Sequence, residues 1–345
     1  VWEAVRGGCS LRLSFPQRKA DELWALLSNL EEHFGCGAGC NAYLTPAESQ
    51  GFAPHYDDVD VFIMQVEGEK RWRVYPPPSE MDTLPFRSSG DFDPDELPEP
   101  CAELTLKPGD LLYLPRGYVH QARTVSSEPS LHLTVSITRR HTWRDLLELG
   151  LRGAVESAAA EDVAWRRSLP REYLSYMGAA FSDSADARRA AFERTSKRLL
   201  SQLVASLPLD AACDQFVASN FMHERLPPFA AHADAAKLEP VELKMTSAVR
   251  LRSRHAARLA IEGDIAVLYH HASNTRVYRG LQEPEHIDFA MEALPAIDRI
   301  INAYPKYVLV GKLPLDTDAQ KMDVANALVE AKLVLLKQPI GGKTT

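Results

Sequence analysis

The chain has 345 residues, of which 45% are hydrophobic, so it is long enough for two or three domains with real apolar cores. Its formal net charge of −8 argues against a general nucleic-acid coat, which would be basic. No apolar run reaches the ~18 residues of a membrane-spanning helix, so we expect a soluble chain. Five cysteines without a C-x-x-C pair indicate a reducing compartment and no disulfide framework.

The first region, residues 1–140, carries short β-type runs separated by turns and begins in strand-like sequence at Val1. Strands are predicted over residues 41–46, 59–68, 70–78, 107–117 and 130–138. Between them, the acidic and proline-rich stretch 88–101 is predicted as a solvated excursion. Cys36 and Cys40 form a C-x3-C pair, a weak zinc signal that we interpret as small turn residues. Because the chain starts at Val1 and not at a methionine, we expect a fragment whose targeting signals are absent.

The remaining two regions differ from the first in their predicted secondary structure. Residues 141–235 are predicted helical, with one helix candidate over 142–165 and a second carrying apolar residues at helical spacing: Phe192, Leu199, Leu200, Leu203 and Leu207. Residues 236–345 mix both types, with a hairpin predicted over 265–280 and helices over 286–305 and 318–336. This mixture suits a small α+β module such as a winged helix.

The sequence "APHYDDVDVFIMQ" places a histidine and an acid two residues apart, ahead of an apolar strand. Residues two apart in extended chain share a face, so His55 and Asp57 project together. They would supply two of the three ligands of a two-histidine, one-carboxylate iron site. His120, which follows a "PGD" turn, a short apolar strand and a "PRG" turn, is the natural third ligand. The alternative for such a pair is a surface histidine–aspartate hydrogen bond; Asp58 points the other way and is interpreted as structural.

Lys70 lies in "KRWRVY", where it shares a face with Trp72 and Val74. An ammonium on an apolar face must either extend to solvent or meet an anion, because burying it unpaired is costly. A dicarboxylate cosubstrate with one end on the metal would supply that anion.

Two further strands carry a polar face. His132, Thr134 and Ser136 alternate with apolar residues in "SLHLTVSI", and Asn41, Tyr43 and Thr45 share a face in "NAYLT". Such faces usually contact water. Taken with the other strands, they predict polar groups converging inside a small β-barrel.

The stretches "NAYLTPAESQGFAPHYDDVDVFIMQVEGEKRWRVY", "PGDLLYLPRGYVHQA" and "LHLTVSIT" resemble the Jumonji-C ribosomal oxygenases, which use Fe(II), 2-oxoglutarate and O2 to hydroxylate histidines of ribosomal proteins. The segments "TWRDLLE" and "LPREYLSYMGAAFSDSADARRAAF" resemble the nucleolar branch, which is also assigned histone lysine demethylase activity. The resemblance implies an α+β multidomain chain. It would comprise an N-terminally truncated double-stranded β-helix (1–140), a helical homodimerisation region (141–235) and a winged-helix-like domain (236–345).

The resemblance also implies roles for individual residues. His55, Asp57 and His120 would bind iron, and Lys70 would pair with the distal carboxylate of 2-oxoglutarate, assisted by Thr134 and Tyr43. Asn41, Tyr43 and Ser136 would contact the substrate histidine. A nuclear, nucleolar location is implied for the family.

Several residues have competing interpretations. His132 is the rival third metal ligand, while His270 and His271 are predicted to be surface residues. The arginines at 250, 252, 254 and 258 are interpreted as a solvated or protein-contacting face and not as a DNA-binding one.

Three functions stay open at this point. They are histidyl hydroxylation of a ribosomal protein, lysine demethylation of a histone tail at the same iron site, and a non-catalytic scaffold in chromatin or ribosome assembly. An intact triad with Lys70 argues against the scaffold.

Overall fold

The computed structural model describes residues 1–125, 127–138, 140–229, 242–277 and 282–337. The described residues fall into two compact units, one within Val1–His141 and Ala218–Thr345 and the other within Thr142–Val217. The mixed α+β class predicted from the sequence is confirmed. No helix in the described ranges is long and apolar enough to cross a membrane.

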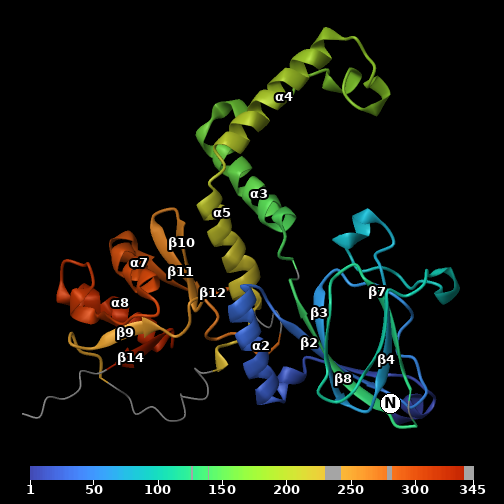
Figure 1. Ribbon diagram of the computed structural model, residues 1–345. Coiled ribbons are helices and arrows are strands. Elements are labelled where there is room, and N and C mark those ends of the chain that lie inside the picture. The colour runs from blue at the N-terminus through green and yellow to red at the C-terminus, as the bar shows by residue number, and fades with distance from the viewer. Residues whose placement is uncertain (126, 139, 230–241, 278–281, 338–345) are drawn as a thin grey trace, which may run out of the picture. The chain divides into compact units, whose positions relative to one another are not determined.

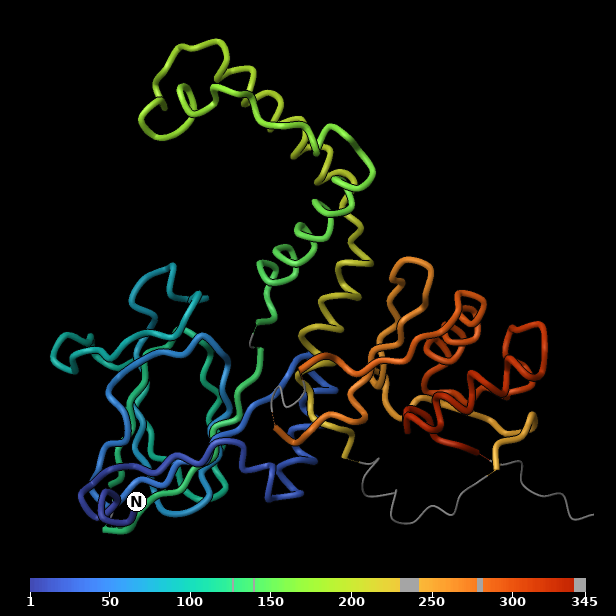
Figure 2. The backbone as a smooth tube through the Cα atoms, turned by 180° about the vertical axis from the view of Figure 1, so that it is seen from behind, coloured from blue at the N-terminus to red at the C-terminus, as the bar shows by residue number. Residues whose placement is uncertain are grey.

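The N-terminal part of the first unit is a barrel of two facing antiparallel sheets (Figures 1 and 2). The larger sheet has the order β1-β2-β8-β3-β6 and the smaller sheet the order β5-β4-β7. The strands are β1 (Leu11–Ser14), β2 (Gly39–Thr45), β3 (Asp60–Glu67), β4 (Lys70–Tyr75), β5 (Ala102–Leu106), β6 (Leu111–Leu114), β7 (Val119–Thr124) and β8 (Ser130–Ile137). This is the predicted double-stranded β-helix, to which the structure adds β1, β5 and β7.

Alternation along the strands separates the inside of the barrel from its outside. In β4, Lys70, Trp72 and Val74 are buried, whereas Arg71 and Arg73 face out and pair with Glu103 of the neighbouring strand. The inner layer contains apolar side chains from both sheets: Val61, Ile63, Trp72, Val74, Leu106 and Leu114. The outer face of the larger sheet is covered by helix α2 (Asp21–Phe34).

Cys36 and Cys40 belong to the apolar layer between α2 and the larger sheet, where both are buried. Burial raises the pKa of both thiols, that of Cys40 to about 12. Both cysteines therefore pack in the core as small apolar side chains. The chain start is not a strand as expected, since residues Trp2–Arg6 form the short helix α1. The 88–101 stretch is an exposed excursion with a single 3-10 turn at Pro94–Glu96.

The second unit is helical, with α3 (Trp143–Glu161), α4 (Ala187–Ala205) and α5 (Leu209–Phe216). Helix α3 begins with a capping box in which Thr142 and Asp145 satisfy each other's backbone N–H groups. It packs closely on α5, since a β-carbon at Gly150 would lie 2.9 Å from that of Ala212.

The C-terminal part of the first unit contains β9 (Ala248–Leu251), β10 (Ala257–Glu262), β11 (Ile265–His270), β12 (Glu285–Ala290), α7 (Leu294–Ala303), β13 (Val308–Leu309), α8 (Asp318–Glu330) and β14 (Val334–Lys337). Strands β10, β11 and β12 form one antiparallel sheet, and β13, β9 and β14 form another. Both sheets pack with the helices around one apolar core.

Three predictions in this part were wrong. The hairpin over 265–280 is not formed in the described residues, because β11 pairs with β10 and β12; residues 278–280 lie outside the described ranges. Residues 285–290 form a strand, with Ile287 and Phe289 on the core side, and the helix begins only at Leu294. Residues 334–337 likewise form a strand after α8 ends.

His270 and His271 were also predicted wrongly, since both are buried, at 4% and 1% exposure. The Nδ1 of His271 donates a hydrogen bond to the carbonyl of Leu226, 2.6 Å away. Burial lowers the pKa of both histidines, so they pack as neutral rings.

Candidate active site

Two backbone segments bring a pair of histidines together at one end of the barrel. His55, in the loop before β3, pairs with His120 on β7 through reciprocal N–H to carbonyl hydrogen bonds of 3.2 and 2.9 Å. Two residues further on, the carbonyl of Asp57 accepts from the N–H of Gly117, in the turn before β7. Gly117 has a φ of +85°, and a β-carbon there would overlap the carbonyl of Asp82, so this turn requires glycine.

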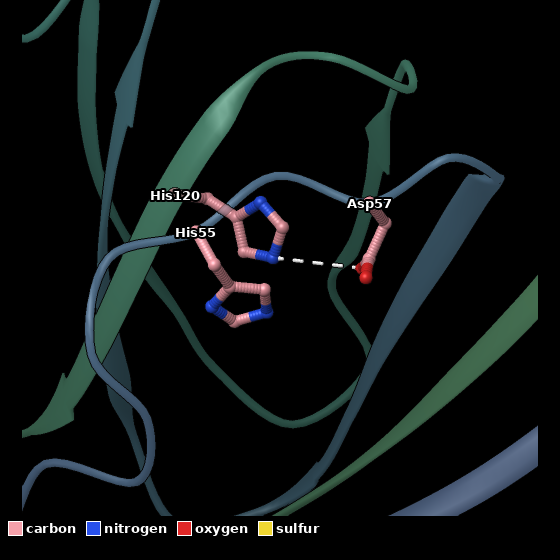
Figure 3. A group of neighbouring side chains, drawn as sticks. All are labelled: His55, Asp57 and His120. Carbon is pink, nitrogen blue, oxygen red and sulfur yellow. Dashed lines mark ion pairs between the residues drawn. The ribbon is translucent and has the colours of Figure 1, made fainter. Parts of the chain in front are cut away.

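These contacts place a nitrogen of each histidine and a carboxylate oxygen of Asp57 within 4.8 Å of one another (Figure 3). The His120 Nε2 atom is 3.9 Å from Asp57 Oδ2, and the two imidazole rings are 4.6 Å apart. Among the histidine, cysteine and acidic side chains of the described residues, these three form the group whose ligand atoms lie close enough together to hold a metal ion.

The tautomer of both histidines follows from their backbone partners. Nδ1 of His55 lies 2.8 Å from the carbonyl of Ala53, and Nδ1 of His120 lies 3.1 Å from that of Tyr118. A carbonyl only accepts, so Nδ1 carries the proton and the lone pair is on Nε2. Burial, and secondarily the charge of His55, lowers the pKa of His120, which favours the neutral ligand form. Two imidazole nitrogens and one carboxylate fit a non-haem iron site.

A cavity of about 180 Å³ extends from this group into the barrel. Lys70, which also lines this cavity and is 3% exposed, donates from Nζ to the hydroxyl of Thr45 at 2.9 Å. Among the described residues, no carboxylate lies within ion-pair distance of this ammonium. Burial lowers its pKa to about 8. The cavity is therefore lined by both a buried cation and a cluster of metal-ligand type.

Tyr43, His132 and Thr134 also line this cavity. The rings of Tyr43 and His132 are stacked 5.1 Å apart. Burial, with the nearby charge of Lys70, lowers the pKa of His132 to about 3, so its ring is neutral. His132 lies outside the group formed by His55, Asp57 and His120. The polar face of β8 thus faces the barrel interior and not water.

The other two predicted substrate residues, Asn41 and Ser136, line a second cavity of about 140 Å³. The structure therefore divides the predicted site residues between two cavities. Sequence analysis missed Arg12, which lines both cavities, and Gln17 and Glu224, which line the second. In "LRLS", Arg12 alternates with apolar residues. This pattern predicts a strand, and with it the position of Arg12 in the barrel could have been found. No local pattern identifies Gln17 or Glu224.

Two family models match the chain. A JmjC domain model matches residues 12–146, and a model of the ribosomal oxygenase 1 C-terminal winged helix domain matches residues 226–340. The winged-helix module predicted from the sequence is confirmed.

Curated relatives cover nearly the whole chain. The Dictyostelium discoideum protein named bifunctional lysine-specific demethylase and histidyl-hydroxylase NO66 is 42% identical over 345 residues, which are 98% of this chain and 67% of that protein. Human ribosomal oxygenase 1 is 41% identical over 355 residues, 99% of this chain and 55% of that protein. The chain thus spans between half and two thirds of the length of these relatives. The solved structure of E. coli ycfD shares the fold, with a TM-score of 0.51 at 18% identity over 95% of this chain and 79% of that one.

Proposed function

The chain belongs to the ribosomal oxygenase family of JmjC proteins, and from this premise we propose that it is an Fe(II)- and 2-oxoglutarate-dependent oxygenase that hydroxylates the β-carbon of a histidine in a ribosomal protein. The observation that carries the proposal is a single cavity lined both by His55, Asp57 and His120 and by the ammonium of Lys70, which has no carboxylate partner among the described residues. A dianion that reaches from a metal to Lys70 is complementary to both.

The donor set fits iron, because both Nε2 atoms have free lone pairs and the carboxylate of Asp57 lies beside them. We assign His55, Asp57 and His120 as the metal ligands. When bound, Fe(II) with 2-oxoglutarate and O2 supplies the oxidising power for hydroxylation.

Around the cosubstrate, Lys70 would pair with the distal carboxylate, with Thr134 and Tyr43 donating from their hydroxyls. His132 would form a neutral wall, since its low pKa keeps the ring uncharged beside Lys70. Closing the cavity with protein side chains excludes water from the reacting carbon.

We assign Asn41, Tyr43 and Ser136 to the substrate histidine. Hydrogen bonds from these side chains to the imidazole would orient the ring and direct its β-carbon toward the metal. Asn41 pairs across the sheet with Thr134, so this group begins where the cosubstrate cavity ends. Holding the β-carbon close to the metal would raise the hydroxylation rate, because the entropic cost of bringing the two together is met when the substrate binds.

The second candidate function is demethylation of a histone lysine, which the name of the Dictyostelium relative includes. It would use the same metal and cosubstrate residues. Mass spectrometry distinguishes the two functions: ribosomal-protein and histone peptides are incubated with the protein, Fe(II) and 2-oxoglutarate. Gain of one oxygen on histidine supports the proposal, and loss of methyl from lysine supports the alternative. A protein that changes neither peptide and consumes no 2-oxoglutarate would instead fit a scaffold in chromatin or ribosome assembly.

The proposal extends to organisation and location. We propose a catalytic domain over 1–140, a homodimerisation region over 141–235 and a winged-helix domain over 236–345, in a protein of the nucleus and nucleolus. In the last domain, Arg250 packs 5.0 Å from the ring centre of Tyr307, and Arg252 donates to the carbonyl of Lys332. These contacts support a structural use of the two arginines over DNA binding.

A further inference from the structure

The loop that carries two of the candidate ligands, residues 53–58, is bonded along one edge to the exposed excursion between β4 and β5. The N–H of Phe92 donates to the carbonyl of Pro54 at 2.9 Å. Ser89 and Tyr56 are joined twice: the Ser89 N–H donates to the Tyr56 carbonyl at 3.0 Å, and the Tyr56 N–H donates to the Ser89 hydroxyl at 2.9 Å. The excursion, which was predicted to be solvated, therefore runs beside the ligand loop much as a neighbouring strand would.

The adjacent serine makes the next contact along the loop. The N–H of Asp58 donates to the Ser88 hydroxyl at 3.2 Å, and that hydroxyl donates to the Asp58 carboxylate at 2.7 Å. The excursion therefore bonds to the residue on each side of both candidate ligands of the loop.

The candidate ligands themselves bond to a different segment. His55 exchanges N–H to carbonyl hydrogen bonds with His120, and the Asp57 carbonyl accepts from the N–H of Gly117 at 3.0 Å. In an extended chain the backbone groups of alternate residues point to opposite edges. The ligand loop is therefore the middle of three paired segments, with the excursion on one edge and residues 117–120 on the other.

Pairing on both edges fixes the direction in which the loop faces. A segment that is paired on one edge only can rotate about that edge, and such a rotation would turn His55 and Asp57 away from His120. With both edges paired, the ligand atoms of the three side chains lie within 4.8 Å of one another (Figure 3). The excursion thus supports the geometry on which a metal site depends.

An earlier part of the excursion contacts both segments that carry candidate ligands. The Tyr56 hydroxyl donates to the Asp82 carboxylate at 2.9 Å, and the Ser79 hydroxyl donates to the same carboxylate at 2.6 Å. The carbonyl of Asp82 also lies against the turn at Gly117, where it would be 2.0 Å from a β-carbon. Residues 79–92 therefore contact the ligand loop and also the turn that leads into β7.

We propose that Ser89 is a positioning residue of the metal site: its hydroxyl, through the backbone of Tyr56, holds the two candidate ligands of the loop in the orientation that binds the metal. Ser88 has the same role at Asp58. Both serines act through the loop and not on the metal, because they lower the rearrangement that the ligands need on binding. This inference rests on the proposed function, since it assumes that the loop binds a metal.

The test is Mn(II) binding to the metal-free full chain, measured by calorimetry. Ser89→Ala removes the acceptor for the Tyr56 N–H, and we expect about tenfold weaker binding, since loss of an outer partner of a metal site typically costs about 10–100-fold. Ser89→Thr keeps the hydroxyl and should bind like the wild type. Thr83→Ala is the matched control, because the Thr83 hydroxyl bonds to the carbonyl of Glu80 within the same excursion. Equal affinity of the wild type and Ser89→Ala, or an equal loss in Thr83→Ala, would overturn the proposal.

Two conditions separate positioning from general stability and from direct ligation. Calorimetry well below the unfolding midpoint of each variant keeps every chain folded, so a loss of stability alone leaves the affinity unchanged. At saturating Co(II) the visible absorption spectrum reports the ligand set, and Ser89→Ala should match the wild type. A spectrum that shows a lost ligand would contradict the positioning role. If Ser89→Ala does not fold, Ser88→Ala carries the same expectation, and an unchanged affinity there would refute the proposal.

The outcome is separable from that of the proposed function. A wild-type chain that binds no Mn(II) would contradict both. Wild-type binding that Ser89→Ala retains in full would contradict only the positioning role. Weakened binding in Ser89→Ala, in a protein that consumes no 2-oxoglutarate, would support the positioning role and contradict only the oxygenase assignment.

Discussion

Backbone carbonyls decide which nitrogen of each candidate ligand is available. Ala53 and Tyr118 each accept from the Nδ1 of the histidine two residues later, so His55 and His120 present Nε2. The same segments are joined to each other by the His55–His120 bridge. Main-chain contacts therefore hold the three side chains together, and as metal ligands they would need little rearrangement.

Removing one ligand should abolish metal binding. We expect Asp57→Ala and His120→Ala to weaken Mn(II) binding, measured by calorimetry, by more than about 100-fold, because even outer-shell changes cost 10–100-fold. His132→Ala is the matched control and should retain binding, since His132 lies outside the ligand group. Strong binding by His120→Ala together with loss in His132→Ala would exchange their roles.

Lys70 should make cosubstrate binding depend on pH. Its pKa is lowered to about 8 by burial, and only the protonated form attracts an anion. We expect the affinity for 2-oxoglutarate to fall as pH rises through about 8, approaching tenfold per unit above it. Lys70→Met should bind weakly at all pH values, without this dependence, whereas Lys107→Met, on an exposed lysine, should behave like the wild type. Titration calorimetry at pH 6.5 to 9.5 measures the affinity for 2-oxoglutarate. A wild-type affinity that does not change with pH would contradict the prediction.

The same shift has a consequence for stability. Between pH 8 and the ordinary lysine value of 10.5, the unfolded chain carries a proton that the folded protein lacks. The free energy of unfolding contributed by this group therefore rises with pH across that window. Lys70 lowers stability below pH 8, as expected of a binding residue whose partner is an external anion.

At the scale of elements, the exposed apolar stripe lies on a different helix from the one that the sequence indicated. The apolar residues singled out on α4 are partly covered, with Leu203 buried and Leu200 57% exposed. On α3, by contrast, apolar side chains four residues apart remain exposed: Trp143 at 79%, Leu147 at 38%, Leu151 at 37% and Val155 at 41%. A stripe at this spacing is typical of a helix that packs on another surface.

This stripe is the surface that the proposed homodimer would use. In a two-fold dimer a single substitution is introduced twice, so Leu147→Arg should yield monomers. Glu156→Arg, on the opposite side of the same helix, should leave the assembly unchanged. Size-exclusion chromatography with light scattering measures the mass. A wild-type mass of one chain, 38.4 kDa, at micromolar concentration would refute the dimer.

Across the molecule, one buried polar cluster joins the barrel to the segment that leads into the winged-helix part. Arg225, 2% exposed, donates to Glu32 of α2 at 3.1 Å and to the carbonyl of His255. Figure 2 shows α2 beside this segment from behind. Glu31 is part of the same cluster, and burial raises its pKa to about 8, although Arg225 acts in the opposite direction.

Glu31 should therefore make stability depend on pH. Between pH 4.5 and about 8 the folded protein holds a proton that the unfolded chain has lost, so stability falls as pH rises through this window. Glu31→Gln should flatten this slope and, because its amide cannot accept on both sides, lower stability at pH 5 by about 1–3 kcal/mol. Urea unfolding from pH 5 to 8 tests both effects, with the exposed Glu22→Gln as control. An unchanged slope in Glu31→Gln would disprove this role.

Features that depend on neighbouring residues could be predicted from the sequence. The spacing of His55 and Asp57, and the alternation that turns Lys70 and Trp72 inward, follow from the two-residue period of extended chain. The helix predicted over 142–165 is also a local feature, and the structure has it at Trp143–Glu161. The helix predicted over 286–305 was wrong at its start, because residues 286–290 alternate polar and apolar side chains as a strand does and pair with β11, while the helical period begins only at Leu294.

Contacts distant in sequence were decided only by the tertiary structure. His270 and His271 were predicted to be surface residues, yet both are buried, and His271 contacts the carbonyl of Leu226, 45 positions away. Gln17, Asn41 and Glu224 line one cavity although more than 200 positions separate the first from the last. A side chain's burial and partners depend on which segments pack across it, and that information is spread over the whole chain. The sequence alone therefore determined the spacing of His55 and Asp57 and the inward lysine, and the packing of distant segments determined the cavity that Gln17, Asn41 and Glu224 line.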